Sequence, residues 1–343
     1  MNQVFFKVLI ISILCIISSN AQYHPPIQNF TPDVYKAGNQ NWNISRDDNN
    51  RIYVANNFGL LEFDGLRWTL HPTPDGSIMR SVFVKNNIVF TGAYMDFGYW
   101  LRNENGTLAY TSLANTVGFQ TIEDEQFWNI FSHKQYILFQ SLNRLVIYNQ
   151  QSNTLKSYNS DYGILDAFVN DDEIYFQDNN RTLFKIENEK SLVYLSAAAL
   201  NQNQVVGLVN TSVGQLIVTR ENGLFLNARN LKATQPQLSK SLAQDVVYSF
   251  TQAANGQLIL GTVKNGVYIL SERGALVHHI NVDSGLNNDT VLSVFSDNRG
   301  VWLGLDDGLA YVKLEAAIQQ YNSQREAIGT AYATIVFNQY LYV

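Results

Sequence analysis

Short runs of apolar residues recur along most of the chain, separated by glycine, asparagine or aspartate. The clearest group predicts four strands: an inner strand at Ser249-Phe250, a second at 258–260, a third at 267–269 and an outer strand at 276–280. Short apolar runs bounded by turn residues are typical of strands buried on both faces, and the intervening glycines suit tight turns. The pattern therefore predicts antiparallel β-hairpins.

This group of strands is repeated along the chain. Residues 205–225 and 291–311 have the same order of apolar runs and turn residues as residues 247–268. The glycine before the third strand recurs at Gly223, Gly266 and Gly308, at intervals of 43 and 42 residues. Weaker copies complete seven units between about residues 40 and 323, and they lie near residues 50–60, 87–99, 136–145 and 173–183.

Seven units of this kind predict an all-β fold, a seven-bladed β-propeller of four-stranded antiparallel blades at residues 40–323. A sheet with apolar residues on both faces needs cover on both sides, and stacking the blades radially around a channel covers all of them. A parallel β-helix is the alternative repeat fold, but its rungs are shorter and need no paired hairpins.

The two ends of the propeller raise separate questions. Residues 22–39 form an N-terminal segment in which Pro25 to Lys36 is expected to supply the closing strand of the seventh blade, with Ile318 to Tyr321 as the alternative. Residues 324–343 resemble the inner and second strands of a further blade. A strand pair that ends there leaves an unpaired edge, so we expect a truncated chain whose intact form continues into a second propeller.

Residues 1–21 are predicted to be a secretory signal peptide. Lys7 precedes an apolar run from Val8 to Ile17, and small and polar residues follow up to Ala21. This run is too short for a membrane-spanning helix, which needs about 20 residues. The single cysteine, Cys15, lies inside the run, so the exported chain would carry no thiol. The expected location is the periplasm.

Composition narrows the function classes. The formal net charge is −6, and the acidic side chains are scattered along the chain. Such a surface discourages binding of nucleic acid. After Ile17 no apolar run is long enough to span a bilayer, so membrane attachment is expected only through a missing C-terminal region.

The repeats resemble the two-component-regulator propeller repeat. Asp297 to Leu309 and Asn255 to Val267 carry its pattern, in which an aspartate or asparagine precedes spaced glycines and a final Gly-Leu or Gly-Val. Residues 37–42 and 92–100 carry further marks of the same family. The resemblance covers nearly all of the chain after the signal peptide.

This resemblance implies an architecture longer than the chain. Members typically carry two seven-bladed propellers, a three-tyrosine β-sandwich and one transmembrane helix, followed by a histidine kinase or a LuxR-like helix-turn-helix output. It implies signal reception outside the cytoplasm, in several relatives by binding oligosaccharides. A homodimer is a possible state of the intact receptor, and the ligand and the output type stay open.

Motifs for catalysis, metals or cofactors are not evident in the sequence. The five histidines show no metal-ligand spacing, and adjacent His278 and His279 would point to opposite faces of a strand. Neither a glycine-rich phosphate loop nor a nucleophile elbow occurs. We therefore expect no cofactor, no metal and no catalytic residue.

A ligand of a propeller would bind at the channel mouth, where loops from several blades converge. Trp42 and Tyr248 lie at entrances to inner strands, and Trp42 and Trp128 could equally pack between blades, because each precedes an isoleucine of the same strand face. Aromatic rings beside charged groups suit a sugar. The predicted ligand-binding residues are Arg80, Tyr94, Asp96, Trp128, Asp166, Arg220 and Lys264.

Three classes of function fit this sequence. The preferred one is a non-enzymatic, extracytoplasmic ligand sensor that passes its signal to missing C-terminal domains. A secreted hydrolase or lyase acting on polysaccharide would need two convergent carboxylates, for which Asp96 and Asp166 are candidates. A scaffold or adhesion propeller would need only an exposed rim.

Overall fold

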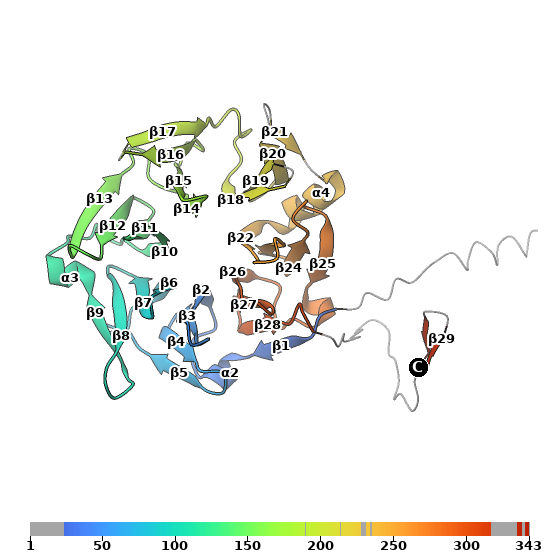
Figure 1. Cartoon of the computed structure of the whole chain (residues 1–343), viewed down its shortest axis with the longest axis horizontal. Helices are drawn as coiled ribbons and strands as arrows, with labels where there is room; N and C mark the ends of the chain where they lie inside the picture. Colours follow the sequence, from blue (N-terminus) through green and yellow to red (C-terminus); the bar gives the residue numbers. More distant parts are fainter. Residues whose placement is uncertain are drawn as a thin grey trace, which may run out of the picture.

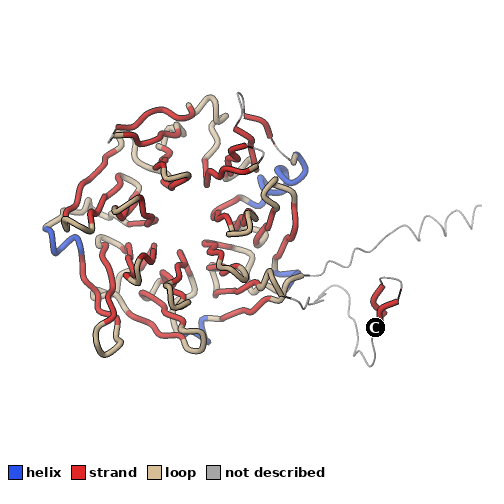
Figure 2. Tube along the Cα trace, in the orientation of Figure 1, coloured by secondary structure: helices blue, strands red, loops and turns tan. Residues whose placement is uncertain are grey.

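The computed structural model describes residues 24–188, 190–212, 214–227, 231–233, 235–316, 335–337 and 340–342. Within them, seven four-stranded antiparallel sheets stand in a ring around one axis (Figure 1). Helix is confined to short segments outside the blades (Figure 2). The predicted all-β, seven-bladed propeller is confirmed. The predicted signal peptide, residues 1–21, lies outside the described residues.

Each blade runs from an inner strand at the channel to an outer strand at the periphery (Figure 1). The inner strands are β2 (Asn41–Arg46), β6 (Met79–Lys85), β10 (Phe127–His133), β14 (Asp166–Asn170), β18 (Val205–Thr211), β22 (Val247–Gln252) and β26 (Val291–Ser296). The second strands are β3 (Ile52–Asn56), β7 (Ile88–Ala93), β11 (Tyr136–Ser141), β15 (Glu173–Gln177), β19 (Gly214–Thr219), β23 (Leu258–Thr262) and β27 (Val301–Leu305).

The third and outer strands complete each blade. The third strands are β4 (Gly59–Phe63), β8 (Phe97–Arg102), β12 (Arg144–Asn149), β16 (Leu183–Glu187), β20 (Gly223–Asn227), β24 (Val267–Leu270) and β28 (Leu309–Val312). The outer strands are β5 (Trp68–His71), β9 (Leu108–Ser112), β13 (Thr154–Asn159), β17 (Lys190–Leu195), β21 (Leu231–Ala233), β25 (Leu276–Ile280) and β1 (Ile27–Phe30).

The outer strand of the seventh blade comes from the N-terminal segment. β1 pairs antiparallel with β28, from Ile27 opposite Val312 to Phe30 opposite Leu309, and the ring closes there (Figure 1). The segment Pro25 to Lys36 thus takes the closing place. The alternative segment, Ile318 to Tyr321, lies outside the described residues. Since closure joins the start of the chain to its seventh blade, the ring depends on pairing between distant segments.

Apolar side chains fill every junction between neighbouring blades. Phe90 and Phe97 of the second blade pack on Ile137 and Phe139 of the third, for example. Seven such clusters occur, one at each junction. Burying one large apolar side chain contributes about 1.5–3 kcal/mol, so these junctions are the main stabilising contacts of the ring. Both faces of a blade are therefore buried, as the apolar residues on both faces of its strands predict.

The recurring glycines lie where the backbone requires them. Gly223, Gly266 and Gly308 have φ angles of 81°, 70° and 103°, in the region that favours glycine. At Gly266 a Cβ atom would also lie 2.1 Å from the carbonyl oxygen of Ile280. The same position of the repeat therefore needs glycine because the turn leaves no room for a side chain.

Within the described ranges, three short helices and one 3-10 turn interrupt the strands. They are α2 (Pro32–Tyr35), α3 (Leu113–Val117), α4 (Pro236–Asp245) and η1 (Val282–Ser284). Helix α4, which the strand pattern does not predict, connects the fifth blade to the sixth and buries Leu242. None of the helices in the described ranges is long and apolar enough to cross a membrane.

A separate two-stranded hairpin follows the ring, formed by β29 (Ile335–Phe337) and β30 (Tyr340–Tyr342). Val336 lies opposite Leu341 in this antiparallel pair. A hairpin agrees with the expected first two strands of a further blade. That it belongs to a second propeller stays a prediction.

Candidate functional site

A β-bulge recurs near the start of six inner strands. In the first blade, for example, Trp42 has no partner because Asn41 pairs with Asn56 and Asn43 with Ala55. A bulge redirects the side chain of its extra residue. The residues at these bulges are Trp42, Arg80, Trp128, Val206, Tyr248 and Leu292.

The fourth blade reaches the same arrangement without a bulge inside its strand. The backbone N–H of Leu165 donates to the carbonyl oxygen of Gln177 at 2.8 Å, and Asp166 pairs with the same Gln177. Leu165 therefore takes the place of the bulged residue. Asp166 takes the next place, which in the other blades holds a small or polar residue, namely Asn43, Ser81, Asn129, Gly207, Ser249 and Ser293.

The six bulged residues and Leu165 all line one cavity of about 740 Å³. Residues of all seven inner strands contribute to its wall, so the cavity is the central channel of the ring (Figure 1). Its volume lies in the range of small-molecule sites, about 300–1,000 Å³. The repeated bulge thus turns one residue from each blade toward a space that could hold a ligand.

One wall of the channel is a stack of a cation and two indole rings. The guanidinium carbon of Arg80 lies 4.3 Å from the ring centroid of Trp42 and 4.5 Å from that of Trp128. The two rings are 5.8 Å apart and nearly perpendicular. The Nε–H of Arg80 donates to Oε1 of Gln126 at 2.8 Å. Burial lowers the pKa of Arg80, but an arginine stays protonated at neutral pH.

The opposite wall combines Asp166, Arg220 and Tyr248. The guanidinium carbon of Arg220 lies 5.3 Å from the ring centroid of Tyr248. One carboxylate oxygen of Asp166 accepts the backbone N–H of Ala167 at 2.8 Å. Burial raises the pKa of Asp166 to about 7, although that hydrogen bond and the charge of Arg220 act against the rise. Asp166 therefore changes charge near neutral pH.

Charged groups of both walls affect the pKa of Tyr248. Burial raises the pKa of its hydroxyl, the charge of Asp166 raises it further, and the charges of Arg220 and Arg80 lower it. All four groups therefore lie close enough to influence one another. A phenol with a raised pKa stays neutral and offers a hydrogen-bond donor rather than a base.

Four predicted site residues come together in this channel. Arg80, Trp128, Asp166 and Arg220 all contribute to its wall. Trp128 also packs on Trp42. Packing and exposure to a ligand were the two alternatives for these tryptophans. The structure shows that they pack on each other and also line the cavity.

The other three predicted residues lie elsewhere. Tyr94 is 39% exposed, and its hydroxyl donates to Asp124 at 2.5 Å outside the channel. Asp96 accepts hydrogen bonds from Tyr110 at 2.9 Å and Ser112 at 2.6 Å, so it stabilises its own blade. Lys264 is exposed in the turn after β23. Loop residues were expected at the mouth, but the bulged inner-strand residues lie closer to the axis and line the channel instead.

Sequence reasoning missed Gln126 and the polar positions that follow the bulges. Gln126 holds Arg80, and Asn129 lines the channel. A detectable signal did exist, because the bulged residue always precedes a small or polar residue in the inner strand. Aligning the seven units on that pair of positions would have placed these residues on the axis.

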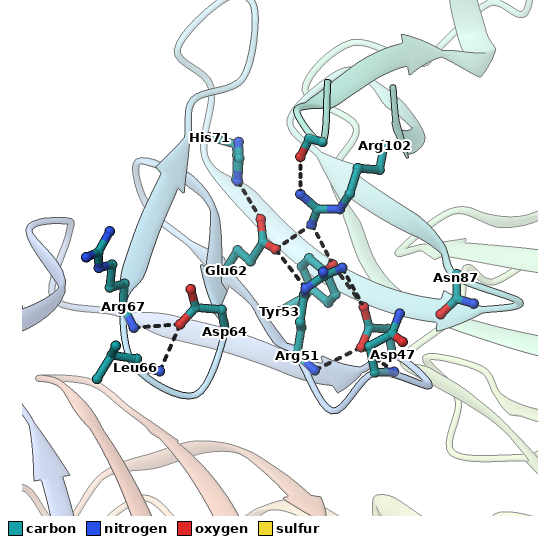
Figure 3. Close-up of polar contacts among 12 residues, drawn as sticks. Asp47, Arg51, Tyr53, Glu62, Asp64, Leu66, Arg67, His71, Asn87 and Arg102 are labelled. Carbon is teal, nitrogen blue, oxygen red and sulfur yellow. Dashed lines mark hydrogen bonds and ion pairs between the residues drawn. The ribbon is translucent and has the colours of Figure 1, made fainter. Parts of the chain in front are cut away.

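A second cluster of charges lies between the first two blades, near the periphery (Figure 3). Glu62 is 7% exposed and forms an ion pair with Arg102, a contact with His71 at 3.0 Å and one with Arg51 at 3.7 Å. Burial alone would raise the pKa of Glu62, but the hydrogen bonds from His71 and Arg102 lower it below its usual value. Tyr53, whose hydroxyl contacts Arg102 and Asp47, completes the network.

The residues that the structure describes form no metal centre of three or more histidine, cysteine, aspartate or glutamate ligands. The one acid at the mouth of the channel, Asp166, lies beside an arginine.

Fold and channel together define a seven-bladed β-propeller with a ligand-sized central cavity. No model of a known protein family matches the chain, and no curated protein matches it. Solved structures do. The chain is similar to the extracellular domain of the putative hybrid two component system BT4673 from B. thetaiotaomicron, with a TM-score of 0.66 and 19% identity over 86% of this chain and 40% of that one.

The chain is also similar to two further solved structures. The extracellular domain of the putative hybrid two component system BT3049 from B. thetaiotaomicron has a TM-score of 0.60 and 16% identity over 85% of this chain and 42% of that one. Virginiamycin B lyase from Staphylococcus aureus has a TM-score of 0.67 and 12% identity over 85% of this chain and 100% of that one. At such identities the likeness shows the fold. The chain spans about two fifths of the two extracellular domains.

Proposed function

We propose that this chain is the extracytoplasmic ligand-sensing propeller of a bacterial signalling receptor and that it binds its ligand in the central channel. The observation that carries the proposal is the convergence of Trp42, Arg80, Trp128, Arg220 and Tyr248 on one cavity. Channels of this kind combine apolar walls with a few polar groups that orient a ligand. The likeness to extracellular domains of hybrid two-component systems supports the same role.

The receptor role includes partners outside this chain. Domains beyond the propeller would receive the signal and pass it through the membrane, and the chain itself would bind no nucleic acid. An oligosaccharide suits the channel because sugar rings stack on aromatic side chains while their hydroxyls bond to charged groups.

A polysaccharide hydrolase is the less supported alternative. It would need two carboxylates about 5–10 Å apart in a cleft. Asp96 was the candidate partner of Asp166, but it is bonded to Tyr110 and Ser112 within its own blade and does not line the channel. The likeness to a lyase concerns the fold. We therefore propose binding without turnover.

Thermal denaturation of the purified chain with a panel of oligosaccharides and peptides tests this function. A ligand present at 100 times its Kd should stabilise the chain by about 2.7 kcal/mol, and mass spectrometry should recover it intact. Trp128→Ala should abolish the shift, whereas Tyr162→Ala should not, because Tyr162 is exposed outside the channel. Shifts that survive Trp128→Ala, or cleavage of the ligand, would contradict the proposal.

A further inference from the structure

The channel mouth carries more hydrogen-bond donors than acceptors. A guanidinium has five N–H donors. Arg80 uses its Nε–H on Gln126, and among the described residues its four terminal N–H groups have no acceptor. The Arg220 guanidinium contacts the face of Tyr248 and forms no hydrogen bond or ion pair with any described residue. Partly buried arginines without protein acceptors favour a ligand that supplies oxygen atoms.

Charge points in the same direction. Two arginines and one aspartate, Asp166, lie at the mouth. The other acid of the wall, Asp171, lies in the turn after β14, at the opposite end of that strand from Asp166. The mouth is therefore positive, whereas the whole chain has a formal net charge of −6. A positive site inside an acidic protein selects for anions.

The backbone fixes Arg220 in this position. Its N–H donates to the carbonyl oxygen of Gln204 at 2.9 Å, and its own carbonyl oxygen accepts the N–H of Val247 at 2.8 Å. These bonds tie the turn after β19 to the entrances of β18 and β22. The side chain therefore starts from a rigid point beside the channel, which lowers the entropy lost when it binds a ligand.

On these grounds we propose that the ligand of the channel is an acidic saccharide whose carboxylate is held by Arg220, with Arg80 as a second cation near the sugar. This inference rests on the proposed sensing function and adds the chemical class of the ligand. Arginine suits the task because its planar fork matches a carboxylate with two parallel hydrogen bonds.

A saccharide fits the rest of the wall better than an acidic peptide does. Asn43, Asn129, Ser249 and Ser293 line the channel beside the tryptophans. These residues occupy the same position of their blades, and Asn129, Ser249 and Ser293 donate to main-chain carbonyls of the next blade. Their oxygen atoms can still accept hydrogen bonds from the hydroxyls of a sugar ring. A cavity of about 740 Å³ has room for a short oligosaccharide. An acidic peptide is the competing ligand, and the test includes it.

Isothermal titration of the full chain with digalacturonate, with the neutral disaccharide galactobiose and with triglutamate tests this inference. We expect digalacturonate to bind at least about 10-fold more tightly than galactobiose, since a charge-assisted hydrogen bond contributes roughly 1.5–3 kcal/mol. We expect a similar margin over triglutamate, which offers carboxylates without sugar rings to stack on the aromatic wall. Arg220→Gln should weaken digalacturonate by about 10-fold or more, and Arg220→Lys should weaken it less. Arg273→Gln, an exposed change away from the channel, should have no effect.

The outcomes separate this inference from the proposed function. Equal binding of galactobiose, or an unchanged affinity in Arg220→Gln, would overturn the acidic-saccharide inference and leave channel sensing intact. Tighter binding of triglutamate would also overturn it. If none of the three probes binds, the inference fails, and the oligosaccharide panel with Trp128→Ala still decides the sensing function. Circular dichroism of Arg220→Gln shows whether a lost affinity reflects lost folding.

Discussion

Two carboxylates of this propeller sit in opposite surroundings. Glu62, between the first two blades, is surrounded by Arg102, His71 and Arg51, and its pKa is lowered (Figure 3). Asp166, in the central channel, has no cationic partner within ion-pair distance among the described residues, and burial raises its pKa to about 7. At the blade junction the carboxylate of Glu62 is paired with cationic groups. In the channel the carboxylate of Asp166 forms no ion pair with a described residue.

The difference separates stabilising charges from functional ones. A buried carboxylate with several partners holds two blades together, and removing it leaves uncompensated cations. A buried carboxylate without a cationic partner costs stability, and Asp166 has the backbone N–H of Ala167 as its hydrogen-bond donor. Perturbed groups that cluster in a cavity are candidates for function. Asp166 is therefore a candidate for the proposed ligand binding.

The largest effect is expected from Glu62→Gln. The substitution leaves Arg102, His71 and Arg51 facing a neutral amide at the junction of the first two blades. We expect a loss of about 2–4 kcal/mol in the free energy of unfolding, measured by urea denaturation. Asp64→Asn is the matched control, because Asp64 is an exposed neighbour that bonds only to backbone N–H groups of its own turn. If Glu62→Gln is as stable as the parent, the ion pairs of Glu62 do not stabilise this junction, and the account of Glu62 is wrong.

Asp166→Asn should act in the opposite direction. The asparagine keeps the shape of the side chain and removes a charge that burial disfavours. At pH 8 we expect a gain of about 1–2 kcal/mol, less than a fully buried charge would give because the channel is open to water. Urea denaturation at pH 8 measures it. A loss of stability would mean that the charge is compensated in the folded protein.

The pH dependence of stability should show both carboxylates. The pKa of Asp166 is about 7 in the folded chain, against 3.8 for an ordinary aspartate, so the folded state holds more protons between these values. Stability should therefore fall as the pH rises from about 4 to 7, and Asp166→Asn should flatten this part of the profile. Arg80, Arg220 and Tyr248 face the same space, and Tyr248 and the arginines keep their charge states there.

Glu62 should dominate at lower pH. Its folded pKa lies below the usual 4.5, so its contribution is present above pH 4.5 and is lost as the pH falls through the folded value. Glu62→Gln should lose less stability than the parent in this acid range. Denaturation curves between pH 2.5 and 5, a range chosen around that value, would show it. Parallel acid profiles for the two proteins would contradict the assignment.

The smallest effect is expected from Gln126→Ala. It removes the acceptor of the Arg80 Nε–H and frees the guanidinium that lies over Trp42 and Trp128. Stability should fall by about 0.5–1.5 kcal/mol, and affinity for a channel ligand should fall severalfold because Arg80 must then be ordered on binding. Tryptophan fluorescence follows both. An affinity equal to that of the parent would show that Arg80 needs no positioning.

The fold could be predicted from the sequence because each blade repeats the same local pattern. The turn glycines, such as Gly266 and Gly308, and the apolar runs of the strands depend on contacts within one unit or between neighbours. Helix α4 escaped prediction because it is an insertion between blades and follows no repeat. Features that repeat in every blade can therefore be predicted from the sequence, whereas an insertion between two blades cannot.

The site could be predicted only in part. Arg80, Trp128, Asp166 and Arg220 line the channel, and the sequence singles them out because charged and aromatic residues at blade entrances are unusual in a core. That they contact a ligand stays a prediction. Asp96 was misplaced, because its hydrogen bonds to Tyr110 and Ser112 join strands of one blade and cannot be seen in a linear pattern. Which side chains meet across the axis depends on the bulge, a feature of three-dimensional pairing.

A crystal structure of the chain grown with digalacturonate tests the central claim most directly. The account predicts electron density for the sugar in the central channel, with its carboxylate against Arg220 and its ring near Tyr248 and Trp128. Density confined to the outer cleft beside Arg51 and Arg102, with an empty channel, would contradict it.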